Sequence, residues 1–232
     1  MDKEIKNNWW VNRIHSKSYL EKMVFSGLHF LIIIIGIWLV FFNWLWLDLI
    51  DKNRAIFLLW FAVLYFIRHL ITLFYLFVRK LEFWEVFWLS SFFFIFEILA
   101  ILVWWGFFTN EIIIFWNLDI FAIILLVIGS FWNTFSEIQR KWWKEDIKNK
   151  WHCYTKGLFK YSMHINFFWD VVLFTGWMLF THCYLMFILP IFMFLAFTFF
   201  HIPNLDKYLL SRYWQEFKKY SEKTKKLIPF IY

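Results

Sequence analysis

Polar and charged side chains gather at the end of one long apolar segment, between residues 133 and 144. On a helix, Asn133, Glu137 and Lys141 share one face, because they recur at intervals of four residues. The same face continues through Ser136, Arg140 and Lys144. It offers donors, a carboxylate and fixed positive charges, which suit a ligand that carries hydroxyls and phosphates. The alternative is a basic helix lying on anionic lipid, which has no use for Asn133 and Glu137.

A second polar group surrounds the start of a later apolar segment. It consists of Tyr161, His164, Asn166 and Asp170. Gly157, just before it, permits a turn that other residues resist. Four polar groups at the mouth of an apolar helix are hard to explain by packing, so we expect a binding site there. No metal is expected, since His152, Cys153 and His164 lack the spacing of a zinc site.

Residues 202–220 predict an amphipathic helix that follows the last apolar segment. Its apolar and aromatic stripe consists of Leu205, Leu209, Tyr213, Phe217 and Tyr220. This helix either lies on the membrane or closes a site against residues 137–164.

Membrane spans must position these residues. The chain of 232 residues is 62% hydrophobic and holds 34 Phe and 18 Trp, whereas soluble domains are about 45–50% apolar. Disorder is excluded by this apolar content, and a disulfide scaffold by the presence of only two Cys. A span needs about 20 apolar residues. We predict one all-α membrane domain over 1–232 with six transmembrane helices, at about 24–46, 55–78, 85–108, 112–132, 166–180 and 184–202.

The basic residues predict the orientation. All 24 Lys and Arg, apart from Lys52, Arg54 and Arg68, lie in residues 1–23, 79–84, 137–164 and 203–232. Because short cytoplasmic loops collect Lys and Arg, both termini are predicted to be cytoplasmic, with 1–23 as an N-terminal cytoplasmic segment. Within it, residues 5–22 predict an interfacial helix. The net charge of +7 is then a signal of topology, and no nucleic-acid partner is expected.

Three charged residues fall inside the predicted spans: Arg68, Glu97 and Asp119. Charges in hydrocarbon are costly, so each is a functional candidate. The structural alternative is that Arg68 pairs with Glu97 between packed helices, while Asp119 extends to the membrane surface.

Two motifs carry a resemblance to a known family. The first is G-L-F-K-Y-S-M-H-I-N-F-F-W-D at 157–170, and the second is P-N-L-D-K-Y-L-L-S-R-Y with T-K-K-L-I-P-F-I-Y at 203–232. Residues 130–232 resemble the steroid 5α-reductase C-terminal superfamily, in particular its bacterial DUF1295 branch of membrane proteins. Residues 60–86 resemble it more loosely.

The resemblance implies an integral membrane enzyme that uses NADPH to reduce a C=C bond in a lipid-like substrate. It implies that Asn133 and Glu137 contact the cofactor and that Lys141 and Lys144 stand near its phosphates. The remaining implied or expected cofactor residues are Tyr161, His164, Asn166, Asp170, Arg212 and Tyr213. Tyr75 resembles the tyrosine that polarises the substrate carbonyl, and is the candidate catalytic residue.

The sequence also departs from the family run S-R-H-P-N-Y-F-G-E. The replacements are Met163, Ile165, Phe167, Trp169 and Asp170. The loss of the Arg removes a contact to phosphate. The Gln-Glu motif that holds a steroid ketone in the steroid-specific members is absent from the first spans, which puts a steroid substrate in doubt. Two alternatives therefore stay open: an S-adenosylmethionine-dependent methyltransferase of the isoprenylcysteine carboxyl type, and a non-catalytic protein of the same fold. The expected partners are membrane lipid and the lipid-like substrate, and the six-span plan favours a bacterial inner membrane over the endoplasmic reticulum.

Overall fold

The computed structural model describes residues 17–42, 51–102 and 113–232, and these contain no β-strand. Its longer helices are α2 (Tyr19–Phe42), α3 (Lys52–Ile71), α4 (Phe83–Leu102), α5 (Asn117–Glu145), α6 (Ile165–Thr181), α7 (Ile188–Ala196) and α8 (Ile202–Lys223). Short π-helical turns are η2 (Thr72–Leu76) and η7 (Phe197–His201); short 3₁₀ turns are η4 (Ile147–Asn149), η5 (Gly157–Lys160) and η6 (Tyr184–Phe187). The all-helical prediction is confirmed.

Five helical segments among the described residues are long and apolar enough to cross a membrane, and α6 is a shorter apolar helix. They match the six predicted spans in order. The predicted span ends at 43–46 and 103–108, the start at 112 and most of the interfacial helix at 5–22 lie outside the described residues. Large apolar side chains are exposed on these helices, among them Trp60, Phe87, Phe131 and Phe192. Such exposure is expected where helices face lipid.

Contacts divide the chain into two compact units, which are described separately. The N-terminal unit comprises the described residues within 15–126 and 174–189. The C-terminal unit comprises 127–173 and 190–232 of the described chain.

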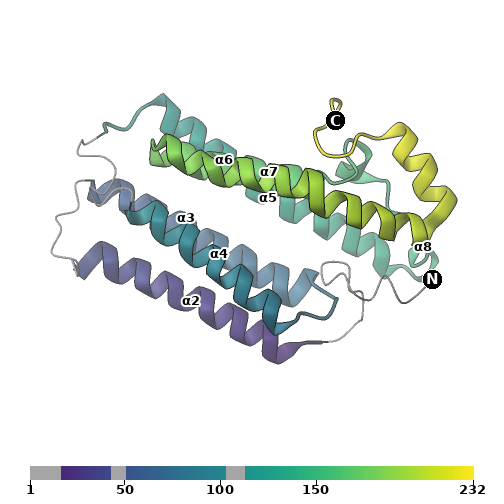
Figure 1. The fold of residues 1–232 in the computed structure, drawn as a ribbon, viewed down its shortest axis with the longest axis horizontal. Helices are drawn as coiled ribbons and strands as arrows, with labels where there is room; N and C mark the ends of the chain where they lie inside the picture. The colour runs from purple at the N-terminus through teal and green to yellow at the C-terminus, as the bar shows by residue number, and fades with distance from the viewer. Residues whose placement is uncertain (1–16, 43–50, 103–112) are drawn as a thin grey trace. The chain divides into compact units, whose positions relative to one another are not determined.

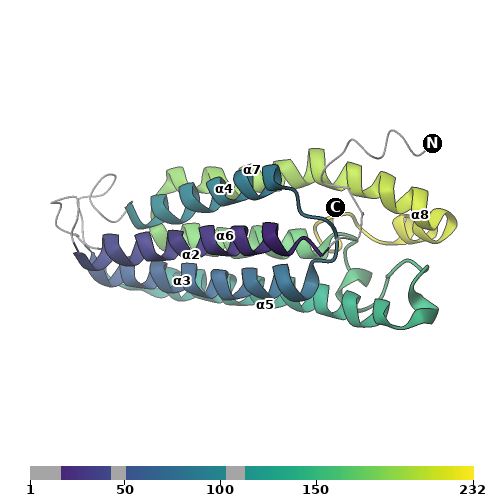
Figure 2. The ribbon, with the colours of Figure 1, turned by 90° about the horizontal axis from the view of Figure 1, so that it is seen from below.

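In the N-terminal unit, α2, α3 and α4 lie side by side (Figures 1 and 2). Their shared core includes Phe25, Ile32 and Phe93, all buried. Aromatic rings of α6 join this unit: Trp177 packs edge-on against Phe96, with ring centroids 4.6 Å apart. Gly176 permits a close approach between α6 and α5, because a Cβ there would lie 2.6 Å from the carbonyl oxygen of Ala122.

The charged residues of the N-terminal unit pair differently from the sequence-based alternative. Asp119 is fully buried and accepts hydrogen bonds from the Arg54 guanidinium, with the His182 ring nitrogen 2.8 Å away. It is therefore held inside the protein and does not extend outward as expected. Glu97 Oε1 lies 2.9 Å from His29 Nε2, so its hydrogen-bond partner is a histidine on α2.

Local predictions are confirmed in both units. Helix α5 continues past the apolar segment as far as Glu145, and α6 ends at Thr181, just before His182 with φ of 53°. Gly157 has φ of 57°, a left-handed conformation that favours glycine. Helix α8 follows α7 and η7, and is interrupted by non-helical φ and ψ at Trp214.

The end of the chain is tied to the loop before α6. The Met163 N–H donates to the Lys225 carbonyl at 2.8 Å, and the His164 N–H donates to the Lys226 carbonyl at 3.0 Å. The Ser162 hydroxyl bonds the carbonyl of Leu227 at 2.8 Å. These bonds hold the two motifs that carry the family resemblance against each other.

Candidate functional site

The polar face of α5 contacts the start of α6. Asn133 is buried and its side-chain amide donates to the Asn166 carbonyl at 2.6 Å. The Ser136 hydroxyl, fully buried, donates to the Asn133 carbonyl at 2.7 Å. Two of the predicted cofactor residues, far apart in sequence, are thus neighbours.

One turn further along α5, Glu137 presents an unsatisfied acceptor. Its Oε2 accepts from Arg140, while its Oε1 is buried and has no hydrogen-bond partner among the described residues. The indole N–H of Trp169, on α6, is likewise buried without a partner in the described chain. Buried polar groups are normally hydrogen-bonded, so each such atom needs an explanation. A bound ligand would supply one.

Lys144, which was predicted to contact a phosphate, already forms hydrogen bonds within the protein. Its ammonium lies 3.0 Å from the Tyr213 hydroxyl and donates to the carbonyl of His152. Since an ammonium has three donors, Lys144 here fixes the loop and α8 and has little capacity left for a phosphate. Lys141 forms a partly exposed ion pair with Glu145 at 3.4 Å.

The remaining predicted residues occupy separate places. His164 is buried and its Nε2 lies 2.8 Å from Asp206 Oδ1 on α8. Asp170 is half-buried on α6. Tyr161 is exposed and packs against Phe230.

Arg212 and Tyr75 are the last two of the predicted site residues. The Arg212 guanidinium lies over the Trp151 ring at 5.2 Å. Tyr75 belongs to η2 of the N-terminal unit, where it is exposed.

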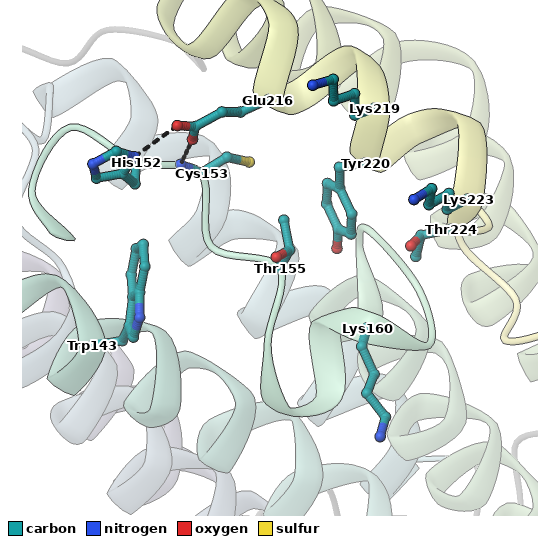
Figure 3. A pocket seen from close by; sticks show the side chains of 10 residues that line it. All are labelled: Trp143, His152, Cys153, Thr155, Lys160, Glu216, Lys219, Tyr220, Lys223 and Thr224. Carbon is teal, nitrogen blue, oxygen red and sulfur yellow. Dashed lines mark hydrogen bonds and ion pairs between the residues drawn. The ribbon is translucent and has the colours of Figure 1, made fainter.

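The C-terminal unit contains a pocket of about 530 Å³ (Figure 3). One wall is α8, and the other consists of the end of α5, the loop after it and η5. Its lining residues are Trp143, His152, Cys153, Thr155, Lys160, Glu216, Lys219, Tyr220, Lys223 and Thr224. Ligand sites of small molecules span roughly 300–1,000 Å³, so the volume suits a small-molecule ligand.

The charge of the pocket lining is predominantly positive. Glu216 is neutralised locally: Oε1 lies 2.6 Å from His152 Nδ1, and Oε2 accepts the Cys153 N–H at 2.8 Å (Figure 3). The Cys153 N–H is the main cause that lowers the pKa of Glu216 below its usual range. Lys160, Lys219 and Lys223 have no ion pair in the described part of the chain. Three ammonium groups are therefore left for an anionic ligand.

The uncharged groups of the lining are held in their neutral forms. Burial raises the pKa of the Cys153 thiol to about 11. Burial also raises the pKa of Tyr220 far above its usual range, and the Tyr220 hydroxyl donates to the Phe159 carbonyl. Neither group is poised as a nucleophile or base near neutral pH. The pocket is thus suited to binding by charge and hydrogen bonds, with no activated nucleophile among these two residues.

None of the ten lining residues was among the predicted site residues. A signal for four of them was present, since Glu216, Lys219, Tyr220 and Lys223 fall at helical spacing on one face of α8. The sequence pattern alone does not show that residues 152–160 meet this face.

These observations define an all-helical integral membrane protein with a cationic pocket among the polar segments of its C-terminal unit. The family described as "Protein of unknown function (DUF1295)" matches residues 73–224. The chain belongs to this family, as the two motifs predicted. No curated protein and no solved structure matches the chain.

Proposed function

We propose that the protein is an NADPH-dependent reductase of a C=C bond in a lipid-like substrate. The observation that carries the proposal is the cationic pocket of the C-terminal unit. All of its lining residues fall within residues 130–232, the region that resembles the steroid 5α-reductase superfamily. We place the protein in a bacterial inner membrane, where a lipid-like substrate reaches the helices through the bilayer.

The donor set of the pocket fits the phosphates of NADPH. Lys160, Lys219 and Lys223 supply point charges, which bind phosphate well. Trp143 adds an aromatic face at the same pocket, and aromatic faces stack on nucleotide bases. A pyrophosphate and a further phosphate would each gain an ammonium partner.

The face of α5 fits the uncharged part of the cofactor. Glu137 Oε1 lacks a donor among the described residues, and a ribose hydroxyl or a carboxamide N–H can supply one. Asn133 is held by the Asn166 carbonyl, which fixes the start of α6 next to this acceptor. These residues would orient the cofactor; the hydride itself is the cofactor's chemistry.

Tyr75 is the proposed donor to the substrate carbonyl. A hydroxyl hydrogen-bonded to that oxygen would stabilise the negative charge that develops when a conjugated C=C bond accepts a hydride. Its place on η2 at the end of α3 keeps it on a helical scaffold.

A methyltransferase that uses S-adenosylmethionine is the second candidate, and a non-catalytic role is the third. S-adenosylmethionine carries no phosphate, and its single carboxylate cannot pair with all three ammonium groups. The pocket therefore favours NADPH, and the comparison of ligands below separates the candidates.

Thermal unfolding of the purified full chain in detergent tests the proposal, with NADPH, NADH and S-adenosylmethionine as probes. A ligand that binds only the native state at 100 times its Kd stabilises it by about 2.7 kcal/mol. We expect a rise in Tm with NADPH and a smaller rise with NADH, which lacks one phosphate. A rise with S-adenosylmethionine alone would favour the methyltransferase, and no rise with any of the three at millimolar concentration would favour a non-catalytic role.

A further inference from the structure

Three titratable side chains of the N-terminal unit form one buried hydrogen-bonded chain. His29 Nε2 lies 2.9 Å from Glu97 Oε1, and His29 Nδ1 lies 2.6 Å from His69 Nδ1. The residues come from α2, α4 and α3 respectively. Exposure is 0% for His29, 1% for Glu97 and 7% for His69, so the chain lies in the interior of this unit.

Both ends of this chain are open. Glu97 Oε2 at one end and His69 Nε2 at the other are buried and have no hydrogen-bond partner among the described residues. A hydrogen bond that only joins two helices does not require three linked titratable groups. Nor does it require an unsatisfied polar atom at each end. Unsatisfied atoms at both ends of this hydrogen-bonded series leave one site for a proton donor and one for a proton acceptor.

The contact between the imidazoles is a hydrogen bond and not part of a metal site. Zinc binds histidine nitrogen at about 2.0–2.1 Å in tetrahedral geometry, which separates two ligand nitrogens by roughly 3.3 Å. The observed 2.6 Å is shorter and leaves room for one hydrogen only. That hydrogen belongs to either ring, so the two imidazoles have two tautomeric arrangements.

We propose that Glu97, His29 and His69 form an intramembrane proton-transfer chain. In its loaded state, the Glu97 carboxyl carries a proton on Oε1, His29 carries one on Nδ1 and His69 carries one on Nε2. A proton that arrives at Glu97 Oε2 drives three shifts: Oε1–H to His29 Nε2, His29 Nδ1–H to His69 Nδ1, and His69 Nε2–H to the acceptor. One proton enters and one leaves, each group gains one hydrogen and loses one, and the net charge of the chain is unchanged.

Aromatic side chains surround Glu97, His29 and His69. The guanidinium of Arg68, the residue before His69, lies over the Tyr65 ring at 5.4 Å. The ring of Tyr65 faces His29 from α3, and Phe93 faces both histidines from α4. Phe25 packs on His69 from α2, with ring centroids 4.2 Å apart. Because aromatic rings cover the chain, protons pass along it in preference to exchanging with water.

Nitrogen NMR of the full chain in lipid nanodiscs tests this proposal without any cofactor or substrate. The protein is labelled with ¹⁵N in the histidine rings, and His29→Gln and His69→Gln assign the signals. We expect the ring nitrogens of His29 and His69 to show shifts averaged between the protonated and unprotonated forms. Both rings should show this averaging together, because a proton shift at one ring accompanies a shift at the other. A fixed tautomer in either ring would overturn the proposal.

The isosteric change Glu97→Gln separates proton transfer from a structural bond. Gln keeps the shape and a hydrogen bond to His29 but cannot pass a proton, so the averaging should be lost and fixed tautomers should appear. Glu82→Gln, an exposed carboxylate just before α4, is the matched control and should leave the signals unchanged. Unchanged averaging in folded Glu97→Gln would contradict the proposal. If that variant does not fold, the averaging in the native protein decides, since fixed tautomers there would overturn the proposal.

Discussion

Glu216 on α8 accepts the backbone N–H of Cys153 at 2.8 Å, across 63 residues of sequence. Its other oxygen lies 2.6 Å from His152 Nδ1, so one carboxylate ties α8 to the loop after α5. This bond forms one edge of the cationic pocket. The pocket therefore depends on the packing of α8 against the loop after α5.

Glu216→Gln should weaken that docking. The carboxylate is half-exposed, so the lost charge-assisted bonds should cost about 1 kcal/mol of the free energy of unfolding. Because the pKa of Glu216 is lowered in the folded protein, mainly by the Cys153 N–H, its contribution is present above the ordinary value of 4.5 and is lost as pH falls through the folded pKa. Tm measured from pH 7 to pH 3 should show the native chain and the variant converging at the acidic end. A constant difference across that range would contradict this assignment.

Gly157→Ala should destabilise the loop that carries Lys160. Residue 157 has φ of 57°, and a Cβ there would lie 2.5 Å from Gln139 Oε1 and 2.7 Å from the Tyr154 hydroxyl. Left-handed strain alone costs roughly 1–2 kcal/mol, so Tm should fall clearly. Gly27→Ala on α2 is the control, since a Cβ there meets nothing within 4 Å. An equal effect of both changes would argue against the observed turn.

Cys153 should react slowly with alkylating reagents. The thiol is 9% exposed, and its pKa of about 11 leaves little thiolate at pH 8, the form that reacts. Alkylation followed by mass spectrometry should show slow modification in the native protein and rapid modification after denaturation. Phe217→Ala, which opens the cluster around Cys153, should speed the reaction. Rapid labelling of the native chain at pH 8 would show that the loop does not pack as described.

Asp119→Asn should destabilise the N-terminal unit more than the joint replacement of both ion-pair partners. The Arg54–Asp119 pair is buried, with exposure of 3% and 0%, and removal of one partner of a buried pair costs about 3–5 kcal/mol. Arg54→Met combined with Asp119→Leu removes both charges of the buried pair and should recover part of that loss, although Asp51, 3.6 Å from Arg54, then loses its ion-pair partner. Thermal unfolding in detergent measures the series. A double variant less stable than Asp119→Asn would refute the view that an unpaired charge dominates.

The helices of this chain could be predicted from the sequence because their signals are local. Apolar length fixes α2, α3 and α4, and the polar group at Thr181-His182-Cys183 marks the end of α6. Hydrophobic period alone predicts the stripe on α8, where Phe217 and Tyr220 are buried as expected. The family was also predicted correctly, since its two motifs are contiguous stretches of sequence.

The partners of charged residues could not be predicted in the same way. Asp119 has suitable partners at Arg54 and His182, which lie 65 and 63 residues away. No local pattern distinguishes them from other basic residues. The pocket lysines were missed for the same reason. Lys160 lines the same pocket as Lys219 and Lys223, and backbone bonds of residues 163 and 164 to Lys225 and Lys226 bring the two segments together. Such contacts depend on tertiary packing and not on sequence spacing.

The central claim is that the lysines of the pocket hold the phosphates of NADPH. The most direct measurement is the NADPH-induced rise in Tm of the full chain in three forms: native, Lys219→Gln with Lys223→Gln, and Lys218→Gln. Lys218 is exposed on α8 but does not line the pocket, so it controls for the loss of one positive charge from this helix. We predict a rise in the native chain and in Lys218→Gln, and a much smaller one in the double variant. An equal rise in all three forms, or none in the native chain, would contradict the account.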